Sequence, residues 1–144
     1  MHLVSLVSKA IDDIARHPQR ALRSSSLGHQ ESFDELVAVW NECRTRNWDG
    51  YDAMPVAQET YRAAFVLIES LPLGFPRPSI GAEPDGHLTL EWHRASHRTL
   101  SVSVDPDGFL HYAGLYGPNK KYGTLVFFET APNELIQLVQ DLYA

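Results

Sequence analysis

Apolar residues follow two different patterns in this chain, a helical spacing in the first half and alternation in the second. Over residues 3–16 they recur three and four positions apart, which predicts an amphipathic helix over residues 1–17. Pro18 and the serines at 24–26 break that pattern and indicate a linker over residues 18–31. The N-terminal helix is expected to pack on its own domain, and contact with a partner is the alternative.

Two further helices are expected in a helical part that covers residues 32–71. Ser32 is a candidate N-cap for the first of them, and Glu35 would complete a capping box with it. Cys43 lies on the apolar face of the same helix, so it is expected to be a buried packing thiol rather than a reactive one. The second helix is expected to begin near Pro55, because proline is tolerated in the first turn.

From residue 77 onward apolar and polar residues alternate, which predicts an antiparallel sheet over residues 77–128. Residues 82–88 and 104–110 each contain Pro-Asp-Gly, which suits a three-residue hairpin loop with glycine in the left-handed conformation. A last strand is expected over residues 122–128, after a loop that begins at Gly117.

These elements predict a single domain, residues 1–144, of class α+β. N-terminal helices precede a four- to five-stranded antiparallel meander sheet, and a C-terminal helix is expected over residues 131–143. Because one face of the sheet is apolar, helices must cover it, which gives two layers.

The hairpin turns determine an expected register, and opposed residues share a face of the sheet. The two Pro-Asp-Gly turns give the pairs Ala82–Leu88, Ile80–Leu90, Val104–Leu110 and Val102–Tyr112. The turn between the second and third strands is looser, and pairing His93 with His97 places Leu90 opposite Leu100. All three hairpins then agree on which face is apolar.

The same register predicts two rows of side chains across the polar face. The first row is Glu83, His87, Ser103 and His111, and the second is Gly81, Thr89, Ser101 and Ala113. Neighbouring strands lie about 4.8 Å apart, so each residue can touch the next one in its row. The second row is a strip of small residues that permits close approach by a helix, by another sheet or by a second copy of the chain. We expect it to be a protein-contact surface, and the alternative is that the chain's own N-terminal helix covers it.

Three interpretations of the first row are open. One is a catalytic relay with Glu83, with His87 as general base and with Ser103 as nucleophile, but the chain has no nucleophile-elbow phrase and no glycine-rich oxyanion loop. Another is a metal site that includes His111, but two strands separate the histidines by roughly 9.6 Å, which is wide for tetrahedral zinc. The favoured interpretation is an exposed or partner-covered polar face, with no metal and no cofactor.

A loop at residues 47–53 is the other candidate site. Trp48 and Tyr51 stand beside carboxylates such as Asp49, a combination that could recognise a basic or planar group. The favoured interpretation is that the two aromatic residues fill the core between helices while the aspartates cap helix ends.

Two phrases in the chain resemble segments of small, uncharacterised bacterial proteins. The first, N-W-D-G-Y-x-A-x-P, begins at Asn47, and the second, A-E-P-D-G-x-L-x-L-E-W, ends at Trp92. The matching part covers about a third of the chain. The resemblance implies a bacterial or phage origin, and it carries no activity or catalytic residue across.

Composition limits the compartment and the partners. The chain has 12 basic and 18 acidic residues, and a net charge of −6 opposes binding to the phosphate backbone of nucleic acids. A single cysteine cannot form an intrachain disulfide. The N-terminus lacks the features of a signal peptide, and no apolar stretch approaches the ~20 residues that cross a bilayer. We therefore expect a cytoplasmic protein that is not bound to a membrane.

Strong catalytic phrases such as a Walker loop, H-E-x-x-H and paired C-x-x-C are missing from the sequence. The expected function is therefore a non-enzymatic protein-interaction domain that binds another protein or a second copy of itself. An antitoxin, an inhibitor or an accessory factor would suit such a domain. A small hydrolase that uses the Glu-His-Ser row is the alternative.

Overall fold

The computed structural model describes residues 29–144, in three helices and five strands. The predicted helix at residues 1–17 lies outside the described residues. The elements, in chain order, are α3 (His29–Cys43), α4 (Gln58–Ser70), β1 (Ser79–Ala82), β2 (Leu88–Ala95), β3 (Arg98–Val104), β4 (Phe109–Tyr116), β5 (Asn119–Val126) and α5 (Asn133–Leu142).

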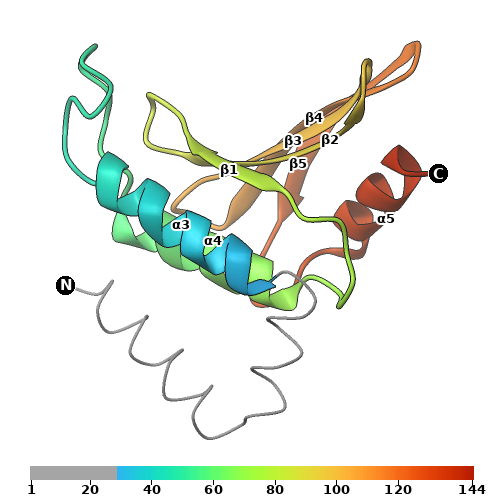
Figure 1. The fold of residues 1–144 in the computed structure, drawn as a ribbon, viewed down its shortest axis with the longest axis horizontal. Helices are drawn as coiled ribbons and strands as arrows, with labels where there is room; N and C mark the ends of the chain where they lie inside the picture. The colour runs from blue at the N-terminus through green and yellow to red at the C-terminus, as the bar shows by residue number, and fades with distance from the viewer. Residues whose placement is uncertain (1–28) are drawn as a thin grey trace, which may run out of the picture.

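The five strands form one antiparallel sheet in the order β1-β2-β3-β4-β5, so each strand pairs with its neighbour in sequence. Helix α3 packs against β1 and α4, and α5 packs against β3 (Figure 1). The predicted two-layer α+β architecture with a meander sheet is confirmed.

The core lies between the helices and the apolar face of the sheet. The alternation puts every second side chain of β2 and β3 on this face, where burial of apolar area stabilises by roughly 25 cal/mol per Å². The buried sheet residues include Leu88, Leu90, Trp92, Leu100, Val102, Val104 and Leu110, and the helices contribute Leu36, Trp40, Tyr61, Leu67, Ile68, Leu135 and Leu142. Cys43 is buried as predicted, and burial raises the pKa of its thiol.

Side-chain hydrogen bonds connect the helices to the sheet. Glu35 in α3 accepts a bond from the backbone N–H of Ile80 at 2.8 Å. The hydroxyl of Tyr116 donates to the carbonyl of Leu138 in α5 at 2.7 Å. The Tyr116 side chain is buried, and its burial raises the pKa of the phenol to about 12. Arg98 donates to the last carbonyls of the same helix, where unpaired acceptors favour a cation.

Several predicted boundaries were wrong. Helix α3 already includes His29, so residues 29–31 are not linker and Ser32 lies inside the helix rather than capping it. Glu35 bonds the sheet instead of completing a capping box. Helix α4 begins at Gln58 rather than near Pro55.

The last strand also begins earlier than predicted. Tyr116 pairs with Asn119, so Gly117 and Pro118 form a two-residue turn in which Gly117 has a φ of 67°. Strand β5 therefore covers Asn119–Val126 instead of residues 122–128. Phe128 falls beyond the sheet.

The register of the outer hairpins is confirmed, and that of the middle hairpin was wrong by two residues. All four pairs predicted from the Pro-Asp-Gly turns are present. Between β2 and β3, however, Leu90 pairs with Val102 rather than with Leu100. Ala95 pairs with Arg98, so the turn is the two residues Ser96 and His97 rather than three, and a bulge between His93 and Ala95 shifts the pairing by one residue. A shift of two residues keeps every side chain on its predicted face and changes only the rows.

Candidate functional site

The loop after α3 is organised by its own polar groups. The carboxylate of Asp49 accepts bonds from the N–H groups of Tyr51 at 2.8 Å and Ala53 at 3.1 Å. The indole N–H of Trp48 donates to the carbonyl of Met54 at 2.8 Å, and the ring packs against the core. Tyr51 is 89% exposed, so the prediction that it fills the core was wrong. Asp49 orders the loop rather than capping a helix.

The two phrases that carry the resemblance lie against each other. The backbone N–H of Met54 donates to the carbonyl of Pro84 at 2.8 Å. Gly86 has a φ of 92°, and a Cβ there would lie 2.9 Å from the carbonyl oxygen of Pro55. The loop therefore supports the β1–β2 turn, which holds the first functional candidates.

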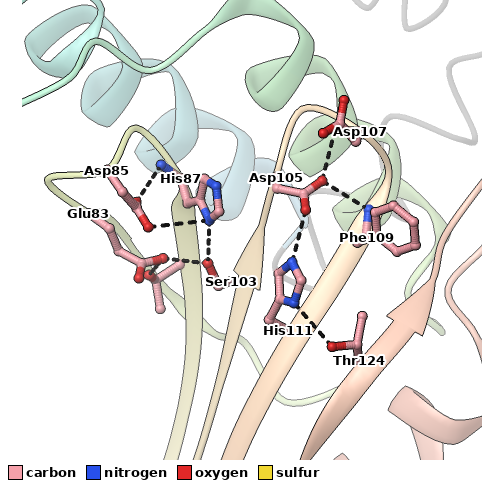
Figure 2. Close-up of polar contacts among 10 residues, drawn as sticks. Glu83, Asp85, His87, Ser103, Asp105, Asp107, Phe109, His111 and Thr124 are labelled. Carbon is pink, nitrogen blue, oxygen red and sulfur yellow. Dashed lines mark hydrogen bonds and ion pairs between the residues drawn. The ribbon is translucent and has the colours of Figure 1, made fainter.

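Glu83, His87 and Ser103 come together on the outer face of the sheet (Figure 2). Ser103 Oγ donates to Glu83 Oε2 at 2.6 Å, and Thr89 Oγ1 donates to the same oxygen at 2.8 Å. His87 Nδ1 lies 3.2 Å from Ser103 Oγ. The residues predicted to meet do meet, although Ser103 is paired with Thr89 and reaches His87 diagonally.

The directions of these hydrogen bonds do not activate Ser103 as a nucleophile. Ser103 has one hydroxyl proton, and its bond to Glu83 uses it. His87 Nδ1 must then donate to Ser103 Oγ, whereas a general base would accept the serine proton. The arrangement rigidifies the face without preparing acyl transfer.

His111, the fourth member of the predicted row, belongs to a separate group of bonds. Its Nε2 lies 2.9 Å from Asp105 Oδ2, and its Nδ1 lies 3.2 Å from Thr124 Oγ1. Its ring stacks on that of His87, with centroids 6.2 Å apart and planes 11° apart. Parallel rings do not converge on one ion, so these two histidines do not form a shared metal site.

The predicted strip of small residues is not continuous. Ser101 pairs with Glu91 on one side and with Ala113 on the other, and Thr89 belongs to the neighbouring row with Gly81. The two-residue shift therefore interrupts the strip with a carboxylate. The predicted row through these four residues was wrong, because they lie in two neighbouring rows.

The sequence interpretation missed a groove of about 800 Å³ at the end of the sheet where the β3–β4 turn, the end of β5 and α4 meet. Its lining residues are Glu59, Arg62, Ala63, Val66, Glu69, Ser70, Pro106, Asp107, Gly108, Phe109, Val126, Phe127, Phe128 and Glu129. Phe109, Val126 and Phe128 are 41%, 55% and 83% exposed. The Phe-Phe pair was a visible signal, but it was assigned to a strand.

The bond between Asp105 and His111 can be tested by the pH dependence of stability. Burial raises the pKa of its carboxyl, but hydrogen bonds from His111 and from two backbone N–H groups outweigh this effect, so the pKa lies below its ordinary value of 3.8. A carboxyl with a lowered folded-state pKa stabilises the fold above its unfolded-state pKa. That stabilisation is lost as the pH falls through the folded-state value.

Asp105→Asn is therefore expected to lower the free energy of unfolding by about 1–3 kcal/mol at about pH 7. The difference from wild type should shrink as the pH falls below 3.8. Urea unfolding at about pH 7 and about pH 3 measures both values. Asp107→Asn, at an exposed carboxylate in the same turn, is the matched control and should stay within about 0.5 kcal/mol. If Asp105→Asn lowers the free energy of unfolding by the same amount at both pH values, the pKa of Asp105 is not lowered in the folded protein.

No family model, curated protein or solved structure matches the chain. Within residues 29–144, no helix is long and apolar enough to cross a membrane. What the fold and the site define is a two-layer α+β domain with a hydrogen-bonded polar face and an apolar groove at one end of its sheet.

Proposed function

We propose that this chain is a non-enzymatic protein-binding domain whose contact surface is the groove between α4, the β3–β4 turn and the end of β5. The exposure of Phe109, Val126 and Phe128 in one place carries the proposal. Clustered apolar side chains at a surface mark interaction sites, and aromatic residues dominate the binding energy of such sites.

The charge around the groove favours a basic partner segment. Glu59, Asp107 and Glu129 line it together with the apolar residues, and Arg62 is the one basic side chain among the lining residues. Opposite charges at the rim of an interface speed association and exclude wrong partners. The partner chemistry that fits is a protein segment with apolar side chains flanked by lysine or arginine.

A cytoplasmic antitoxin, inhibitor or accessory factor of bacterial or phage origin is the role that suits this surface. The acidic net charge and the resemblance of the two sequence phrases support it. The hydrolase alternative needs Ser103 to pass its proton to His87, and the bond from Ser103 to Glu83 directs the proton elsewhere.

Phe128→Glu is expected to weaken partner binding by about 30-fold, because loss of an aromatic anchor costs ~2 kcal/mol. The tagged wild type and the variant are each used to isolate bound proteins from the native cell. Each candidate partner is then purified and titrated against both. The affinity should also fall as salt concentration rises, since the rim charges are exposed.

Tyr51→Glu is the matched control, because Tyr51, like Phe128, is a largely exposed aromatic residue but lies outside the groove. It should bind the purified partner as wild type does. An equal loss in both variants, or no loss in Phe128→Glu, would place the contact surface elsewhere.

A further inference from the structure

The β1–β2 turn places three metal-ligating side chains at alternate positions. Glu83, Asp85 and His87 each offer one ligand atom, and these atoms lie within 4.8 Å of one another. Figure 2 shows the three side chains on the same side of the turn. The sequence interpretation considered Glu83 and His87 for a metal site but paired them with His111, and it did not consider Asp85.

The spacing of two of these ligands already suits a zinc ion. Asp85 Oδ2 and His87 Nδ1 are 3.6 Å apart. Two ligands at about 2.1 Å from a tetrahedral Zn²⁺ ion are themselves roughly 3.4 Å apart. A small side-chain adjustment is therefore enough for both to bind one ion.

The third ligand is held in place by hydroxyl groups. Ser103 and Thr89 both donate to Glu83 Oε2, and within residues 29–144 no hydrogen bond occupies Oε1. Carboxylates that ligate metals are commonly fixed by such outer hydrogen bonds. When His87 Nδ1 binds the ion and gives up its proton, Ser103 keeps its bond to Glu83.

The backbone of the turn is rigidly supported. The N–H of Gly86 donates to the carbonyl of Glu83 at 2.9 Å, and Met54 donates to Pro84 from the adjoining loop. Ligands carried by a fixed turn lose little conformational entropy when they bind an ion.

The chain contains a second turn of the same shape without the histidine. Asp105 and Asp107 correspond to Glu83 and Asp85, and Phe109 stands where His87 stands in the first turn. The comparison shows that the turn accepts phenylalanine at this position. His87→Phe is therefore a variant that removes the imidazole and keeps the backbone.

We propose that Glu83, Asp85 and His87 bind one Zn²⁺ ion, through Oε1, Oδ2 and Nδ1. His87 and Asp85 are 28% and 58% exposed in their side chains, so a fourth position is open to water or to a ligand from a partner. Three protein ligands with one open position are the arrangement of zinc sites that take up an exogenous ligand. The proposal stands independently of the protein-binding function.

Calorimetric titration of the full chain with Zn²⁺ tests the site. Wild type is expected to bind one ion that His87→Phe does not bind, and Glu83→Gln should weaken binding by about 10- to 100-fold. His93→Phe is the control, because His93 is exposed and bonds Thr99 outside the cluster. It should bind as wild type does. Circular dichroism checks that each variant is folded.

Two results would overturn the proposal. One is a wild type that binds no Zn²⁺ up to about 1 mM. The other is a folded His87→Phe variant that binds as tightly as wild type, which would show adventitious binding at other side chains. Titration with Co²⁺ adds a spectroscopic reading, because the visible absorption of the bound ion reports its coordination.

Discussion

Replacing Trp92 by alanine is expected to lower the free energy of unfolding by about 3–5 kcal/mol, the usual cost of deleting a fully buried tryptophan. Its side chain has no exposed surface, and its indole N–H donates to the carbonyl of Pro76 at 2.8 Å. Phe75 packs edge-on against it, with ring centroids 6.5 Å apart. The substitution removes these contacts together and leaves a cavity under the sheet. Urea unfolding followed by circular dichroism measures the loss.

Tyr122→Ala is the control for this experiment. Tyr122 is also an aromatic strand residue, but it is 81% exposed on β5. Its replacement should change the free energy of unfolding by no more than about 0.5 kcal/mol. Equal losses in the two variants would mean that Trp92 is not part of the core.

The sheet was largely predictable because its outer turns encode their own geometry. Pro-Asp-Gly permits few backbone conformations, and Gly86 and Gly108 indeed have φ values of 92° and 88°. The middle turn has no such signal. His97 adopts a φ of 60° there, and a bulge between His93 and Ala95 changes the pairing.

The candidate sites were less predictable, because they depend on which residues pair across the strands and on segments that lie far apart in the sequence. A two-residue shift leaves the faces intact, so hydrophobic pattern alone cannot detect it. The contact of His87 with Ser103 survived the shift because long side chains also reach diagonal neighbours. The groove joins α4 to residues beyond β5, and such a meeting requires the tertiary fold.

Gly86→Ala is expected to lower the free energy of unfolding by about 2–4 kcal/mol. Its φ of 92° is strained for any residue with a Cβ, which costs about 1–3 kcal/mol. The new Cβ would also lie 2.9 Å from the carbonyl oxygen of Pro55, so backbone must move. Because that movement separates the loop from the turn, hydrogen exchange at Met54 should accelerate together with the loss measured by urea unfolding.

Gly81→Ala is the matched control, because Gly81 lies in the adjoining strand with ordinary φ and no atom within 4 Å of a new Cβ. It should stay within about 0.5 kcal/mol of wild type, with unchanged exchange at Met54. If Gly86→Ala is as stable as Gly81→Ala, the backbone at Pro55 does not pack closely against the β1–β2 turn. The contact between the two sequence phrases would then not be what supports Glu83, Asp85 and His87.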